Sequence, residues 1–244
     1  MRRDPLLLVP YLAVGLLFAT LDWMRRRDPL PTLEFEPLRV DGGISISVEF
    51  VGYPTGIPHT SALLESFVGL RFGYLAWGIV SYLLPLLAVA VASAYVLHRA
   101  IGAELLNLGS GMGTWVGSIL PLFGFVLAMD LFQRLLGSIA LLQDMGLLGL
   151  VPLALYFLVM IRLFVVPGLL VLGYAPREAL RVSNRLTRGR GWLLFGVVLV
   201  LGLAAWLLAS VPLPSAGPVL STTLVAPVHA LAIVVVLERS NAAG

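Results

Sequence analysis

Cysteine and lysine are both absent from this chain of 244 residues, so all sixteen basic residues are arginines. Without cysteine the chain forms no disulfide, and it offers no thiolate nucleophile and no zinc–thiolate site. The arginine bias has two explanations. A GC-rich genome would produce it, and so would binding of phosphate or lipid headgroups, which the planar guanidinium serves better than an ammonium group.

Charged residues are also scarce. They make up 12% of the chain, against 59% hydrophobic residues, whereas a soluble domain carries about 25% charged residues. The mean hydropathy of +0.98 is typical of a protein that lies in a lipid bilayer. The net charge is only +3, and no basic surface with interleaved aromatic residues lies outside the apolar segments. We therefore expect membrane lipids, and no nucleic acid, as partners.

Six apolar segments are long enough to cross a bilayer, which takes about 20 helical residues. They lie at about residues 5–23, 67–97, 113–142, 147–172, 192–211 and 218–237. The second and third are longer than a straight span, and Pro85 and Pro121 within them predict kinks. We expect an all-α integral membrane fold, a six-helix transmembrane bundle that forms one membrane domain over residues 1–244. Counts of five or seven spans are also compatible with the pattern.

The sizeable loop 25–66 has the signals of a β-hairpin. Hydrophobic and polar residues alternate from Ile44 to Phe50, which is the period of a strand. Asp41-Gly42-Gly43 supplies a turn, and residues 33–40 are the candidate partner strand. We expect a hairpin on the outer face, either as a lid over helix ends or as a recognition surface. Residues 53–58 are expected to form an irregular turn before the second span.

Arginine placement predicts how the chain is oriented, because cytoplasmic loops keep an excess of positive charge. The loop 173–191 holds five arginines, more than any other stretch. With this loop inside, both termini and the loop 98–112 are also inside. The first span is flanked by Arg-Arg-Asp-Pro-Leu on both sides and so cannot orient itself. We expect a multi-pass protein of the cell membrane with both termini cytoplasmic.

The arginine-rich loop itself has the pattern of a short helix, because Pro176 is suited to open one and Gly189 to end one. Four basic residues recur at helical spacing and share one face: Arg177, Arg181, Arg185 and Arg188. The other face carries Ala179, Val182, Ser183 and Leu186. This predicts an amphipathic helix over about 176–188 in the inner headgroup layer. Its arginines either only fix topology or form a site for anionic lipid or a partner protein.

A small set of polar residues falls inside the predicted spans: Asp130, Gln133, Arg134 and Arg162. A charge in the hydrocarbon costs at least about 2.5–3.5 kcal/mol, so these groups should be paired. Asp130 and Arg134 are one helical turn apart. Counting from the turn between the third and fourth spans puts Asp130 and Arg162 at similar depth, so a bridge between them is also possible. The cluster is either a clamp between helices or part of a transport path.

No constellation for catalysis is visible. His229 lies within the sixth span, and we interpret it as a hydrogen-bonding histidine. His59 and His98 fall on opposite membrane faces in this threading, which excludes a three-histidine metal site. The glycine-rich stretch 109–113 lacks the lysine and the hydroxyl residue of a phosphate loop. We expect no enzyme, no metal and no cofactor.

The arginine segment also carries a resemblance to a known family. Its motifs are Arg162-Leu163, Pro167, Ala179-Leu180, Ser183 and Leu186-Thr187-Arg188-Gly189, followed by 217–222, Pro227-Val228-His229 and Glu238-Arg239. They resemble multi-pass membrane proteins of uncharacterised activity, archaeal and especially haloarchaeal, which are similar to the membrane domain of glycerophosphoryl diester phosphodiesterases. The match covers about the last ninety residues well. The catalytic domain of those phosphodiesterases is absent, so the resemblance implies a fold and a membrane location and no hydrolase activity.

These patterns favour a non-catalytic membrane scaffold or accessory protein that interacts with anionic lipid or with other membrane proteins. The alternative is a small transporter or permease component with a polar path near Asp130 and Arg162. The oligomeric state does not follow from the sequence.

Overall fold

The computed structural model describes residues 5–28, 30–34, 39–40, 44–45, 52–62, 67–101, 115–136, 150–211 and 216–241. The helices are η1 (Pro5–Leu7), α1 (Leu8–Arg25), α2 (Phe72–Ala100), α4 (Ile119–Leu136), α6 (Leu150–Leu163), α7 (Val166–Val171), α8 (Pro176–Leu186), α9 (Gly191–Ala209) and α10 (Ala216–Asn241). The strands are β1 (Thr32–Glu34), β2 (Arg39–Val40), β3 (Ile44–Ser45) and β4 (Thr60–Ala62).

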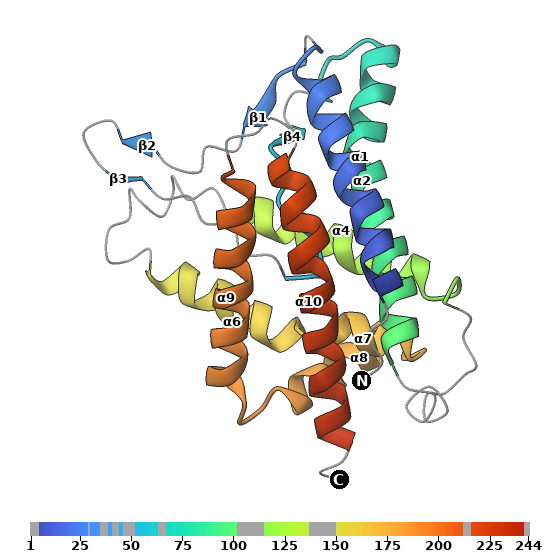
Figure 1. The fold of residues 1–244 in the computed structure, drawn as a ribbon, viewed down its shortest axis with the longest axis vertical. Coiled ribbons are helices and arrows are strands. Elements are labelled where there is room, and N and C mark those ends of the chain that lie inside the picture. Colours follow the sequence, from blue (N-terminus) through green and yellow to red (C-terminus); the bar gives the residue numbers. More distant parts are fainter. Residues whose placement is uncertain are drawn as a thin grey trace.

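Four long helices run along the long axis of the molecule, and they are α1, α2, α9 and α10 (Figure 1). In the same view α4 and α6 lie across that direction. α1 packs against α2 and α10, and α10 also packs against α9. The approach of α1 to α10 depends on Gly15, since a Cβ there would lie 2.9 Å from the Cα of Val219. The buried apolar side chains of all these helices form one core.

Five segments are long and apolar enough to cross a membrane: Leu8–Arg25, Phe72–Ala100, Val151–Val171, Gly191–Ala209 and Ala216–Ser240. This confirms the prediction of a mainly helical membrane protein. The expected third span at 113–142 corresponds to α4, and α4 is not among the five. Both ends of that expected span lie outside the described residues. The count of six spans therefore stays a prediction.

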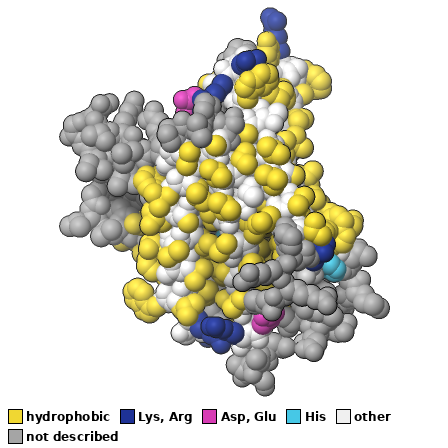
Figure 2. Space-filling view, viewed as in Figure 1, with side chains coloured by type: hydrophobic (Ala, Val, Ile, Leu, Met, Phe, Trp, Pro, Cys, Tyr) yellow, Lys and Arg dark blue, Asp and Glu magenta, His cyan; other side chains and the backbone are white. Residues whose placement is uncertain are grey.

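The surface has the distribution of a membrane protein. On the face shown in Figure 2, hydrophobic side chains cover the middle of the molecule, and the arginines in view lie toward its upper and lower parts. Aromatic side chains mark both ends of the apolar region: Trp23 and Tyr74 are exposed where α1 ends and α2 begins, and Trp192 is exposed at the start of α9. Such amphipathic rings are enriched where hydrocarbon meets headgroups.

Pro85 lies inside α2, which continues as one helix on both sides of it, so the expected kink there stays a prediction. Pro121 lies in the first turn of α4, where the missing N–H breaks no helical hydrogen bond. The break falls instead in the fourth expected span, where α6 ends at Leu163 and α7 starts at Val166 with Pro167 in its first turn. The fourth span is therefore two helices.

The loop after α1 contains part of the expected hairpin and a second pair of strands. β1 pairs antiparallel with β4, with Leu33 opposite Ser61, so the two ends of the loop are joined. β2 and β3 also pair antiparallel, with Val40 opposite Ile44, around the expected turn. Residues 46–50, the rest of the expected strand, lie outside the described residues. The longer outer hairpin therefore stays a prediction.

Residues 52–62, which we term the re-entrant segment, pass into the helix bundle (Figure 1). Residues 53–58 form no helix or strand, as predicted, but residues 52–57 are all buried, which the sequence pattern did not indicate. A Cβ on Gly56 would lie 2.6 Å from the Cα of Thr222 in α10, and one on Gly52 would lie 2.6 Å from Cε of Met129 in α4. The two glycines thus let a nonhelical backbone lie between helices.

Candidate functional site

α8 has the two faces that the sequence pattern predicts. Three arginines with helical spacing are exposed on it, Arg177, Arg181 and Arg185, and Arg188 is exposed in the turn after the helix, which ends at Leu186 and not at the predicted 188. Ala179 and Ser183 are completely buried on the opposite side, and Thr187, directly after the helix, is 1% exposed. Gly189 has a φ of +81°, which lets the chain turn sharply out of the helix toward α9.

Hydrogen bonds attach α8 to the end of α6. The Ser183 hydroxyl donates to the carbonyl oxygen of Arg162 over 2.6 Å, and Nη1 of Arg162 donates to the carbonyl oxygen of Asn184 over 3.2 Å. The Thr187 hydroxyl donates to the carbonyl oxygen of Ser183, which closes the last turn. The basic face is therefore carried by a helix that is fixed in position from its small-residue side.

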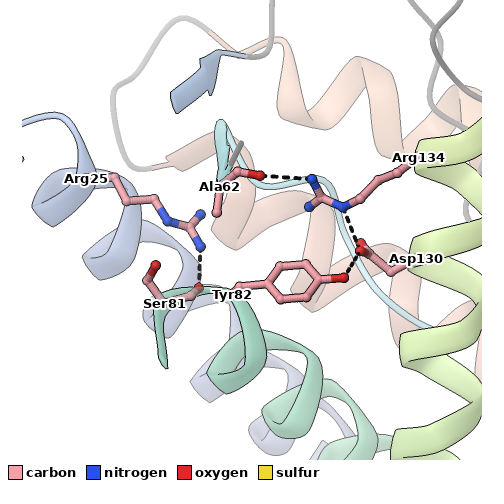
Figure 3. Close-up of polar contacts among 6 residues, drawn as sticks. All are labelled: Arg25, Ala62, Ser81, Tyr82, Asp130 and Arg134. Carbon is pink, nitrogen blue, oxygen red and sulfur yellow. Dashed lines mark hydrogen bonds and ion pairs between the residues drawn. The ribbon is translucent and has the colours of Figure 1, made fainter. Parts of the chain in front are cut away.

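Asp130 belongs to a polar group between α2, α4 and β4 (Figure 3). The carboxylate pairs with Nε of Arg134 at 2.7 Å and accepts a hydrogen bond from the Tyr82 hydroxyl at 2.8 Å. Nη1 of Arg134 donates to the carbonyl oxygen of Ala62 in β4 over 2.9 Å. This confirms the expected pair within α4. It also connects α4 with α2 and with the end of the re-entrant segment.

The possible bridge between Asp130 and Arg162 is not formed, because Arg162 contacts α8 instead. Where α4 and α6 meet, Nε2 of Gln133 donates to the Tyr156 hydroxyl over 3.2 Å. Arg162 lies six residues beyond Tyr156, about 9 Å farther along α6. The prediction that Asp130 and Arg162 lie at similar depth assumed two straight antiparallel helices, and it therefore missed this offset. The four predicted polar residues therefore fall into separate groups.

A second polar group, at the end of α1, is absent from the predicted sites. Asp22 is 2% exposed. Its Oδ1 accepts from the backbone N–H of Thr60 at 2.9 Å and from the Thr60 hydroxyl at 2.6 Å, and its Oδ2 accepts from the N–H of His59 at 3.0 Å. Asp22 is an acid inside a predicted span, and that signal was sufficient to mark it.

Arg25 completes this group from one turn farther along α1. Its guanidinium donates to the carbonyl oxygen of Thr60 over 2.6 Å and to that of Ser81 in α2 (Figure 3). The side chain is 7% exposed. Arg25 therefore works as an interior connector of α1, α2 and β4, although its position in a basic run suggested a loop charge that fixes topology.

The re-entrant segment makes its deeper polar contacts with α10 and α2. The N–H of Ile57 donates to the Ser221 hydroxyl over 3.0 Å. The Ser93 hydroxyl lies 3.2 Å from that of Tyr11 and donates weakly, over 3.5 Å, to the carbonyl oxygen of Pro54. Nonhelical backbone at membrane depth is tolerated where protein or water surrounds it. Here protein side chains supply these contacts.

His229 lies farther along α10. It is 2% exposed, and its ring stacks on Phe164, in the break between α6 and α7, with centroids 5.1 Å apart. Its Nε2 and the hydroxyls of Thr222 and Thr223 are buried and have no hydrogen-bond partner. The ring contact with Phe164 was not predicted, and the hydrogen-bonding role suggested by the sequence stays a prediction.

No protein-family model matches the chain, and no curated protein or solved structure matches it.

Proposed function

We propose that the protein is a non-catalytic scaffold or accessory protein of the cell membrane that binds anionic lipid headgroups through α8. The observation that carries this proposal is the exposure of Arg177, Arg181 and Arg185 on one face of α8, with Arg188 exposed just after the helix, while the opposite face of α8 is fixed to α6. Trp192 follows nearby with 88% of its surface exposed. Basic residues beside an interfacial aromatic suit the phosphate layer of an anionic leaflet.

The topology belongs to the same proposal. Both marked chain ends lie in the lower part of Figure 1, where α8 also lies. Chain ends on one side require an even number of complete crossings, and six spans meet this requirement if both α4 and the α6–α7 segment cross. The arginines of α8 favour the cytoplasm for that side. The resemblance to the membrane domain of glycerophosphoryl diester phosphodiesterases fits this arrangement and adds other membrane proteins as possible partners.

A small transporter is the second candidate function. It is favoured by the re-entrant segment and by the unpartnered polar atoms of Thr222, Thr223 and His229 on α10. A path near Asp130 and Arg162 has less support, because Asp130 is held by Arg134 and Tyr82 while Arg162 contacts α8. Transport would depend on the interior of the bundle, whereas headgroup binding depends on its basic end.

The double variant R181Q/R185Q tests headgroup binding. Each arginine near an anionic surface contributes about 1 kcal/mol, so removing two should weaken retention of phosphatidylglycerol roughly 30-fold. The measurement is native mass spectrometry of the purified protein with equal amounts of phosphatidylglycerol and phosphatidylcholine in the micelles.

The control is R26Q, which removes the charge of an exposed arginine directly after α1, at the opposite end of the molecule from α8 (Figure 1). It should retain phosphatidylglycerol almost as the unmodified protein does. If R181Q/R185Q retains as much phosphatidylglycerol as this control, α8 is not a headgroup site.

A further inference from the structure

An open groove of about 710 Å³ lies at the opposite end of the molecule from α8, between the end of α1 and the start of α2. Its lining includes Arg27, Asp28, Arg71, Gly73, Tyr74 and Trp77. Both arginines are exposed. The volume lies within the range of ligand pockets, about 300–1,000 Å³. We propose that this groove binds the phosphate headgroup of an anionic lipid from the other leaflet.

The charges of the groove favour an anion. Arg27 stacks on the ring of Trp23 with its Cζ 3.9 Å from the ring centroid, so the edge of the guanidinium is available for hydrogen bonds. Arg71 precedes α2 on the other side of the groove. Asp28 is the one acid of the lining, and its Oδ1 accepts from the N–H of Leu30 at 3.2 Å. Two cations against one carboxylate leave the groove positive.

A lipid fits better than a soluble phosphate compound because the groove continues into an apolar stripe. From Trp77 the exposed residues Val80, Leu84 and Leu87 follow at spacings of three, four and three along α2. They therefore share one face of the helix. From Trp77 to Leu87 the stripe is about 15 Å long, which is one half of the hydrocarbon core. The headgroup would lie between the two arginines. One acyl chain would lie along this stripe.

Two variants test the groove independently. R27Q/R71Q removes its positive charges and should weaken phosphatidylglycerol binding at the groove roughly 30-fold, so that one bound lipid is lost and the lipid at α8 is kept. G73L fills the groove and leaves both arginines in place. A Cβ on Gly73 meets nothing within 4 Å, so G73L should fold normally and still weaken phosphatidylglycerol binding at the groove about tenfold.

The chain offers a matched control for each variant. R26Q removes a neighbouring exposed arginine that does not line the groove. G196L adds the same side chain to α9, where a Cβ also meets nothing within 4 Å. Both controls should retain phosphatidylglycerol as the unmodified protein does, and all variants should keep its melting temperature in detergent.

The ligand is identified by comparing the retention of two lipids and the effect of inorganic phosphate. Preferential retention of phosphatidylglycerol over phosphatidylcholine, unaffected by excess inorganic phosphate, supports the proposal. Equal retention of the two lipids would overturn it, and so would displacement by inorganic phosphate, which would assign the groove to soluble phosphate compounds. The site does not depend on α8. If R181Q/R185Q loses lipid and the groove variants do not, only the groove proposal fails; the reverse result leaves the groove and removes α8.

Discussion

Replacing Asp22 by alanine is expected to lower the free energy of unfolding by about 3–5 kcal/mol, the usual effect of removing one partner from a buried charged group. The substitution leaves the N–H groups of His59 and Thr60 without their acceptor. It also leaves the buried guanidinium of Arg25, one turn away, without a neighbouring negative charge. Unfolding in detergent micelles, followed by circular dichroism, measures the change.

Asp28→Ala is the control for this prediction. Asp28 follows α1 and accepts one hydrogen bond, from Leu30, in a partly exposed turn. Its loss should cost about 1 kcal/mol. Equal stability of the Asp22 and Asp28 variants would show that the polar group at the end of α1 does not fasten the re-entrant segment.

Replacing Gly56 by alanine should destabilise the protein by about 3 kcal/mol or more, because the new Cβ would overlap backbone and not a movable side chain. It would lie 2.6 Å from the Cα of Thr222. Either α10 or the re-entrant segment must move, and the hydrogen bond from Ile57 to Ser221 would then be lost. The same unfolding measurement applies.

Gly196→Ala makes the identical chemical change in the middle of α9, where a Cβ meets nothing within 4 Å. It should be neutral or stabilise the helix by up to about 1 kcal/mol, because alanine has the higher helix propensity. If both alanine variants unfold alike, Gly56 is not in close contact with α10.

Features with local signals were predictable from the sequence. α8 has a proline at its start, a glycine after its end and arginines at helical spacing, and the structure has it at Pro176–Leu186. The pair of Asp130 and Arg134 follows from their spacing within one helix. The apolar runs likewise predict most of the long helices, to within a few residues at each end.

Features that depend on distant contacts were not predictable in this way. The re-entrant segment is rich in proline and glycine, so it has the composition of a surface turn, and its burial depends on the fit of Gly56 against Thr222. A usable signal was present, since no charged residue occurs from Val51 to Ala62. The position of Arg162 depends on the break after α6, which shifts its partner from Asp130 to α8.

The central claim is that the chain spans the membrane with α8 on the cytoplasmic side. Because the sequence has no cysteine, a single introduced cysteine is the only thiol in each variant. Val68, 86% exposed shortly before α2, and Asn184, exposed on α8, report on the two ends. A membrane-impermeant maleimide should label V68C in intact cells and N184C only after permeabilisation. Labelling of N184C in intact cells would contradict the orientation. Labelling of both V68C and N184C in intact cells would contradict the spanning fold.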